Sequence, residues 1–389
     1  MNNKTNILGL IIALIATVGL MSCGDDEANG PSLDVPTTYT FERNGSSTVS
    51  YSGQTDRLNM LAEIKTLLLT GDAGNAVDAT VLTNMYANEG SPFTTADLNA
   101  STKQLENKTF VADVQFFKDL MNDLGTQSAA IAQSKAVATE GNPGLLDRDG
   151  NGKTILVNEK GWEYTQIIEK GLMGAVFYNQ IFNVYLTDAR IGTDVDNETI
   201  VEGTNYTAKE HHWDEAFGYF GVPVDFPAGD PVLEASEDRF WANYTNDLNT
   251  PEKLPNVNST LMNAYLTGRA AIVADDFDMI NEQRDILYDW HEIVTAATAI
   301  HYINSTISDL NNNNDIANAF HHLSEAYAFL KAVQYSPFKR LTQSEINTIL
   351  NSNFGTDANF WNVTISGLNE AKNTISSKYP ELTPIKDIL

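Results

Sequence analysis

Apolar residues recur at helical spacing through most of this chain. Two clear stripes are formed by Leu58, Leu61, Ile64, Leu67 and Leu68, and by Phe110, Val114, Phe117 and Leu120. Positions three or four residues apart lie on one side of an α-helix, so both stripes predict amphipathic helices. The pattern also predicts helices over residues 158–187, 208–220, 236–248, 257–285, 286–308, 314–334, 341–352 and 358–378.

Few segments have the pattern expected of strands. Thr38–Phe41 and Thr154–Val157 are short and could be isolated strands or extended loops. Thr342 and Glu345 have the spacing of a capping box and predict a helix start. We therefore expect an all-α fold over residues 38–389, with few or no strands, built as one large helical domain or as two bundles.

The first residues have the pattern of a lipoprotein signal. The apolar run from Ile7 to Leu20 is shorter than the roughly 18 to 20 residues that span a bilayer. It ends in Leu20-Met21-Ser22-Cys23, which resembles a bacterial lipobox, and Cys23 is the only cysteine. We predict that residues 1–22 are a signal peptide and that Cys23 carries lipid, palmitate included; a structural cysteine is the alternative.

Residues 23–37 are acidic and polar, which predicts a flexible tether. Asp25, Asp26 and Glu27 resemble the export signal of Bacteroidetes-type lipoproteins that reach the outer face of the outer membrane. An ordinary solvated linker explains them equally well. We expect an outer membrane lipoprotein, either periplasmic or surface-exposed.

The formal net charge of -27, with 42% hydrophobic residues, describes an acidic globular protein. This charge repels phosphate backbones and anionic lipid surfaces, so nucleic acid is excluded as a partner and the lipid anchor must hold the protein at the membrane. The same charge attracts cations, although acidic surfaces also serve solubility.

One segment occurs twice. Residues 211–220 match residues 321–330, and four of the six histidines lie in these two copies. Ala175–Tyr178 similarly resembles Ala299–Tyr302 ahead of each copy. This indicates a duplicated helix-loop-helix unit.

In each copy, two histidines and a glutamate should share one face of the helix, within reach of one another: His211, His212 and Glu215, and His321, His322 and Glu325. Imidazole with carboxylate suits iron or zinc, and two facing helices could hold one ion or small ligand between them. The groups could also act as a general acid and base, or satisfy each other in a buried polar seam. Further contributions could come from His291, Glu292 and His301.

The lipobox, the helical body and the pair His212 and Glu215 resemble the imelysin-like superfamily. The segments Lys170–Ala175 and His212–Tyr219 more closely resemble an uncharacterised branch of Bacteroidetes lipoproteins with a domain of unknown function. The resemblance implies two pseudo-symmetric helical bundles, with halves at about 38–225 and 226–389. It also implies a site at His212 and Glu215, iron uptake in some relatives and peptidase activity in others.

This chain departs from the superfamily pattern at one position. Glu210 replaces the glycine two residues before the histidine, which weakens the peptidase interpretation. His211 and Asp214 are additions in this sequence.

Asp147, Asp149 and Asn151, followed by Gly152, have the spacing of the first ligands of a calcium loop. The closing acid is missing, because Asn158 stands at that position. A solvated turn has the same composition and is the alternative.

Together these features predict an envelope-anchored, metal-associated binding or accessory protein for nutrient or iron acquisition, with protein partners that the sequence does not name. The alternative is an imelysin-like peptidase or hydrolase that uses His212 and Glu215.

Overall fold

Helices dominate the part of the chain that the computed structural model describes, which is residues 33–227, 239–312 and 315–389. The all-α prediction is confirmed, with two short two-stranded sheets. Val35–Leu389 form one compact unit. The predicted signal peptide and Cys23 lie outside the described residues, as does most of the predicted tether. None of the described helices is both long and apolar enough to cross a membrane.

The first part of the unit contains two helices of 21 residues each, several short helices, and a central helix made of the consecutive segments α5, η3 and η4. Its elements are α1 (Ser52–Asp72), α2 (Ala79–Ala87), α3 (Ala96–Ala100), η1 (Glu106–Lys108), η2 (Val111–Asp113), α4 (Val114–Ser134), α5 (Tyr164–Leu172), η3 (Met173–Tyr178), η4 (Ile181–Tyr185), α6 (Asp188–Ile191) and α7 (Ala208–Phe220). The π-helical segments η3 and η4 continue α5 with little interruption.

The second part contains the longest helix, α10. Its elements are α8 (Trp241–Leu248), α9 (Val257–Ala274), α10 (Phe277–Asn311), α11 (Ile316–Val333), α12 (Gln343–Thr348), η5 (Ile349–Asn353), η6 (Thr356–Ala358), η7 (Phe360–Asn362) and α13 (Ile365–Lys378). At about 1.5 Å per residue, α10 is about 50 Å long and contacts α9, α11 and α13.

Two antiparallel hairpins complete the described unit. The first pairs β1 (Glu42–Arg43) with β2 (Ser46–Ser47), and residues 38–41, predicted as a strand or an extended loop, form no strand and lead into β1. The second pairs β3 (Gly144–Asp147) with β4 (Thr154–Val157), which confirms the other strand prediction.

Three predicted helix boundaries are wrong: the helix expected to begin at 358 begins at Ile365, and the other two have clear local reasons. The division expected near residue 285 falls at Asp275, which adopts left-handed φ of 55°, followed by Asp276, whose side chain accepts a hydrogen bond from Met279 N–H. The helix expected to begin at 158 begins at Tyr164, because the Asn158 side chain accepts from the backbone N–H groups of a tight turn. Side chains that bond nearby backbone favour turns over helix.

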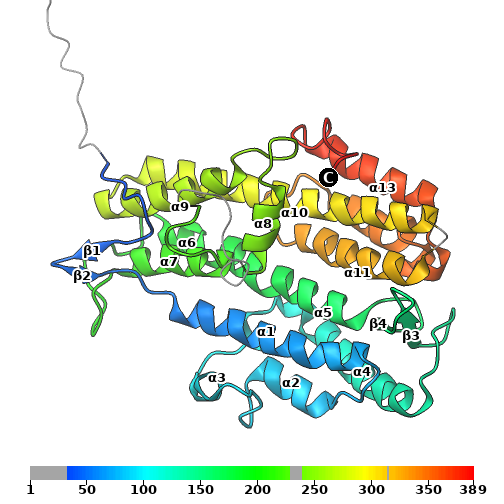
Figure 1. The fold of residues 1–389 in the computed structure, drawn as a ribbon. Coiled ribbons are helices and arrows are strands. Elements are labelled where there is room, and N and C mark those ends of the chain that lie inside the picture. Colours follow the sequence, from blue (N-terminus) through cyan, green and yellow to red (C-terminus); the bar gives the residue numbers. More distant parts are fainter. Residues whose placement is uncertain (1–32, 228–238, 313–314) are drawn as a thin grey trace, which may run out of the picture. The chain divides into compact units, whose positions relative to one another are not determined.

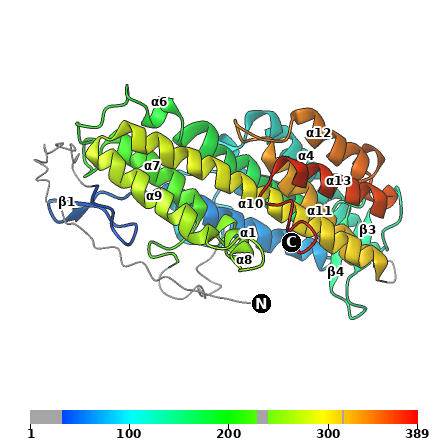
Figure 2. The ribbon, with the colours of Figure 1, turned by 90° about the horizontal axis from the view of Figure 1, so that it is seen from above.

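The central helix lies between two groups of helices. All nine residues of α5 are buried, and the helix contacts α1 and α4 on one side and α11 on another (Figure 1). Farther along, η4 contacts α7. Seen from above, α10 runs beside α9 at one end and α11 at the other (Figure 2).

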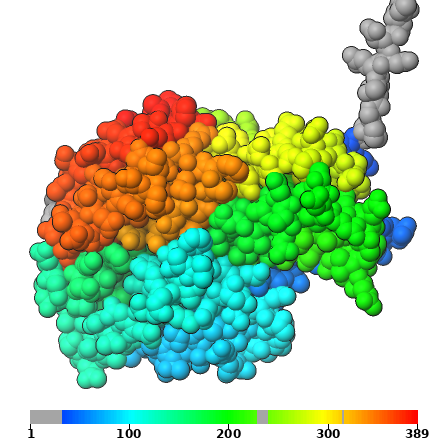
Figure 3. Space-filling view, turned by 180° about the vertical axis from the view of Figure 1, so that it is seen from behind, coloured from blue at the N-terminus to red at the C-terminus, as the bar shows by residue number. Residues whose placement is uncertain are grey.

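The C-terminal segment closes onto the β3–β4 region. The Trp162 indole N–H donates to the Ala358 carbonyl at 2.7 Å, and Phe360 N–H donates to the Lys160 carbonyl at 2.8 Å. In the view from behind, the orange-red C-terminal residues therefore adjoin the blue-green residues near 150 (Figure 3).

Candidate functional site

The first histidine motif lies on α7, which begins with a capping box that the sequence analysis missed. Thr207 Oγ1 accepts from Glu210 N–H, and the Glu210 carboxylate accepts from Thr207 N–H. One turn later, His211 Nδ1 lies 2.9 Å from the Ser50 carbonyl, and its Nε2 lies 3.9 Å from Glu215 Oε1.

His212 does not join this pair. Its Nδ1 donates to the Arg190 carbonyl at 2.9 Å, and burial lowers the pKa of the imidazole. Glu215 instead accepts a hydrogen bond from Gln54 Nε2 at 3.0 Å. The two rings bond to different backbone carbonyls, His211 to that of Ser50 and His212 to that of Arg190. The expectation that all three side chains share one face is therefore wrong for this copy.

The additional acids of α7 form a buried ion network. Arg269 Nε donates to Asp214 Oδ1 at 2.9 Å, and its Nη1 donates to Glu210 Oε1 at 3.1 Å. The Tyr39 hydroxyl also donates to Asp214, and burial raises the pKa of this carboxyl to about 6 even though Arg269 opposes the shift. Glu210 and Asp214 therefore bind α9 to α7 through Arg269. The side chain at position 210 has a structural role that a glycine could not perform.

The second motif, on α11, brings its three side chains together. One ligand atom each from His321, His322 and Glu325 lies within 4.8 Å of the other two. His321 Nε2 is 3.6 Å from Glu325 Oε2. Among the described residues, this is the one group of three or more histidine, cysteine or acidic side chains close enough to hold a metal ion.

Each imidazole of this motif is held from behind by a carboxylate. Glu163, just before α5, places Oε2 2.7 Å from His321 Nδ1, and Asp309, in the last turn of α10, places Oδ2 2.6 Å from His322 Nδ1. The sequence analysis missed both acids. They come from other helices, and no local spacing connects them with α11.

Burial sets the charge state of this cluster. It lowers the pKa of His321 to about 4 and also lowers the pKa of His322, so both rings are neutral at pH 7. Burial raises the pKa of Glu163 to about 8 and raises that of Glu325, against the attraction of the buried Lys170 ammonium. Neutral imidazole is the form that binds metal.

The two motifs do not form a shared site. Glu163 contacts His321 at the start of the central helix, whereas Tyr185, at its end, lies beside Gln54, the partner of Glu215. Twenty-two residues separate Glu163 from Tyr185, which at roughly 1.5 Å per residue places the motifs about 30 Å apart (Figure 1). The expectation of one ion held between two facing helices is wrong.

The other predicted contributors lie elsewhere. His291 is buried, and its Nε2 lies 3.0 Å from the Tyr265 hydroxyl, within hydrogen-bond distance. Burial lowers the pKa of its imidazole to about 3. Glu292 accepts from the Tyr379 hydroxyl and from Arg340 N–H. His301 lines a small cavity beside Tyr302 and Asp247.

The predicted calcium ligands lie in the turn between β3 and β4. Asp147 accepts hydrogen bonds from the backbone N–H groups of Asp149, Gly150 and Gly152, and Asp149 accepts from Asn151 and Lys153. These bonds fit the alternative of a solvated turn, and calcium binding stays a prediction.

The comparison with protein families decides the relationship. A family model described as a domain of unknown function (DUF4856) matches residues 36–381. The chain belongs to this family. The match confirms the prediction of a domain of unknown function, whereas the wider imelysin-like relationship and the Bacteroidetes branch stay predictions. No curated protein and no solved structure matches the chain.

Proposed function

We propose that this member of the family binds a transition-metal ion, iron or zinc, through His321, His322 and Glu325. The observation that carries the proposal is the meeting of two imidazoles and one carboxylate within 4.8 Å on one helix. Ligand atoms that bind one ion at about 2.0 to 2.2 Å lie closer to one another than 4.8 Å. Small side-chain rotations would therefore bring the three ligand atoms to binding distance of one ion.

The carboxylates behind the rings support this assignment. Because Glu163 and Asp309 occupy the Nδ1 atoms, each ring keeps Nε2 for an ion. Carboxylate–imidazole–metal arrangements of this kind fix the tautomer of the ring and increase its basicity as a ligand. Three protein ligands leave one or more coordination positions for water or a small ligand.

In this proposal the protein is an envelope-anchored lipoprotein that assists nutrient or iron acquisition. The lipobox at Cys23 and the net charge of -27, which attracts cations, support this role. The peptidase alternative has less support, because His212 and Glu215 bind different partners, Arg190 and Gln54.

Elemental analysis of the purified mature protein tests the proposal. We expect about one equivalent of metal per chain after loading, and a strong loss in the His321→Ala/Glu325→Ala variant. The matched control is His211→Ala/Glu215→Ala, which removes the equivalent residues of the first copy and should keep the metal. Metal that stays well below one equivalent in all three proteins, with no change of melting temperature on adding zinc or iron, would contradict it.

A further inference from the structure

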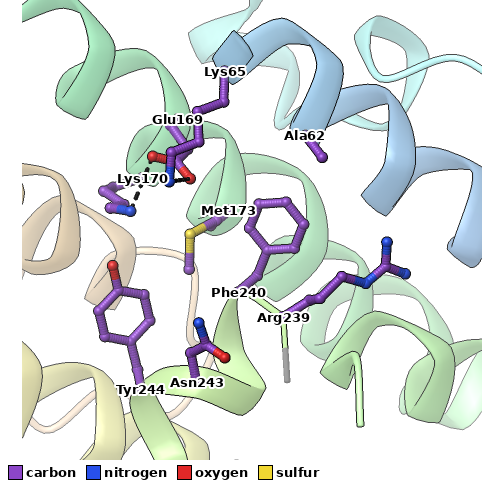
Figure 4. A pocket seen from close by; sticks show the side chains of 9 residues that line it. All are labelled: Ala62, Lys65, Glu169, Lys170, Met173, Arg239, Phe240, Asn243 and Tyr244. Carbon is purple, nitrogen blue, oxygen red and sulfur yellow. Dashed lines mark hydrogen bonds and ion pairs between the residues drawn. The ribbon is translucent and has the colours of Figure 1, made fainter. Parts of the chain in front are cut away.

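A cavity of about 200 Å³ lies between α1, the central helix and α8 (Figure 4), and its lining residue Lys170 also attracts Glu325 of the second motif. Its polar lining includes Lys65, Glu169, Lys170 and Arg239, and its apolar lining includes Met173 and Phe240. The volume is smaller than the roughly 300 to 1,000 Å³ typical of drug-sized ligand pockets, so the cavity suits a molecule of few atoms.

Two ammonium groups in the wall share one carboxylate. Glu169 Oε1 lies 2.9 Å from Lys65 Nζ, and Oε2 lies 2.9 Å from Lys170 Nζ, as the dashed lines in Figure 4 show. The Lys170 side chain is only 7% exposed, and Glu169 is its one hydrogen-bond acceptor among the described residues. An ammonium has three donors, so this buried group has capacity for a further acceptor.

Arg239 adds a third cation to the same lining. Its Nη1 donates to the neutral side chain of Asn59, and within the described residues no carboxylate forms an ion pair with it. The cavity therefore carries three cations against one carboxylate. In a chain with a net charge of -27, such a local excess of positive charge favours an anion.

The apolar part of the lining limits the kind of anion. The Phe240 ring, the Met173 thioether and the Tyr244 ring lie around the cavity, and the Lys170 ammonium lies 5.4 Å from the centre of the Tyr244 ring. Inorganic phosphate would leave these apolar surfaces uncovered. We propose that the cavity binds a small organic carboxylate, with its charged group against Lys170, Lys65 and Arg239 and its apolar part against Phe240 and Met173.

Calorimetric titration with three probes tests this site in the intact mature protein. Phenylacetate should bind, whereas the neutral isostere phenylacetamide should bind at least about tenfold more weakly, since it loses charge-assisted hydrogen bonds. Inorganic phosphate should bind more weakly than phenylacetate. Equal binding of phenylacetate and phenylacetamide, or binding of phosphate alone, would overturn the proposal, as would the failure of all three probes to bind.

Variants that remove a positive or a negative charge from the cavity lining test whether phenylacetate binds there. Arg239→Gln and Lys65→Gln, at partly exposed positions, should each weaken phenylacetate binding about tenfold, while Glu169→Gln should strengthen it by removing the competing carboxylate. Lys118→Gln, in an ion pair with Glu106 outside the cavity, is the matched control and should leave affinity unchanged. Unchanged affinity in the first three variants, with folding verified by circular dichroism, would assign the binding to another place and overturn the proposal.

Discussion

The imidazoles of the two motifs differ in what lies behind each ring. On α11, His321 and His322 each contact a carboxylate through Nδ1, whereas on α7 both rings contact backbone carbonyl groups. A carboxylate behind the ring raises the affinity of Nε2 for a cation more than a carbonyl does. This contrast favours α11 as the metal site although the two sequences are similar.

Replacing the carboxyl groups behind the rings with amides should weaken metal binding without changing the ligands. We expect Glu163→Gln and Asp309→Asn each to reduce zinc affinity by roughly 10- to 100-fold, measured by competition with a chelating dye. Asp289→Asn, at an exposed acid on the same helix as Asp309, is the control and should bind as the wild type does. Wild-type zinc affinity in both Glu163→Gln and Asp309→Asn would argue against a role for these two side chains in metal binding.

His291 should make stability depend on pH. Its pKa is about 3 in the folded protein against about 6.5 when unfolded, so below pH 6.5 the unfolded state binds the proton more readily. The neutral ring therefore contributes stability above pH 6.5 that is lost progressively as the pH falls toward 3. A single such group lowers the free energy of unfolding by about 2 kcal/mol between pH 7 and pH 5.

Urea unfolding of His291→Gln at pH 7 and pH 5 measures this contribution. We expect the variant to lose less stability than the wild type over this interval, by about 2 kcal/mol. His211→Gln removes a histidine at a less buried position and serves as the control. The same pH-dependent loss in His291→Gln as in the wild type would show that His291 is not the responsible group.

At the scale of elements, the sequence predicts most helices but not their irregularities. The helix at 208–220 and the capping box at Thr342 follow local rules, and the structure confirms both. The π-helical segments η3 and η4 do not follow from spacing, because they occur where a largely buried helix packs against several neighbours. The association of Glu163 with α11 was likewise beyond local rules, since it depends on tertiary packing.

Close packing of the central helix against α11 depends on a small residue at Gly174. A methyl group there would lie 2.6 Å from Ala332 Cβ and 3.2 Å from its Cα, which requires the two helices to move apart. We expect Gly174→Ala to destabilise the protein by about 1 to 3 kcal/mol in urea unfolding. Gly53→Ala is the control, because its new methyl group meets only the flexible Lys103 side chain within 3.5 Å. Equal stability of the two variants would contradict this account.

At the scale of the whole molecule, composition predicts the class of fold and the charge, but not the packing partners. The sequence similarity between α7 and α11 did not reveal that they lie at opposite ends of the central helix. Two helices with similar sequences can lie far apart in the fold, because tertiary contacts determine where each helix packs. The candidate metal site consequently changed from one shared by two helices to one on α11 alone.

The predicted attachment through Cys23 also belongs to the scale of the whole molecule. We expect Cys23→Ser to abolish lipid attachment and to move the protein from the membrane to the soluble fraction, as measured by fractionation and mass spectrometry of the N-terminal peptide. Ser22→Ala keeps a small residue before the cysteine and should leave lipidation intact. An unmodified Cys23 in the wild-type membrane fraction would refute the lipid anchor.

The most direct test of the central claim is anomalous diffraction at the zinc edge from crystals of the mature protein grown with zinc. We predict an anomalous peak about 2.0 to 2.2 Å from Nε2 of His321, Nε2 of His322 and a carboxylate oxygen of Glu325. A peak between His211 and Glu215 with none at α11, or no peak at either motif, would contradict the account.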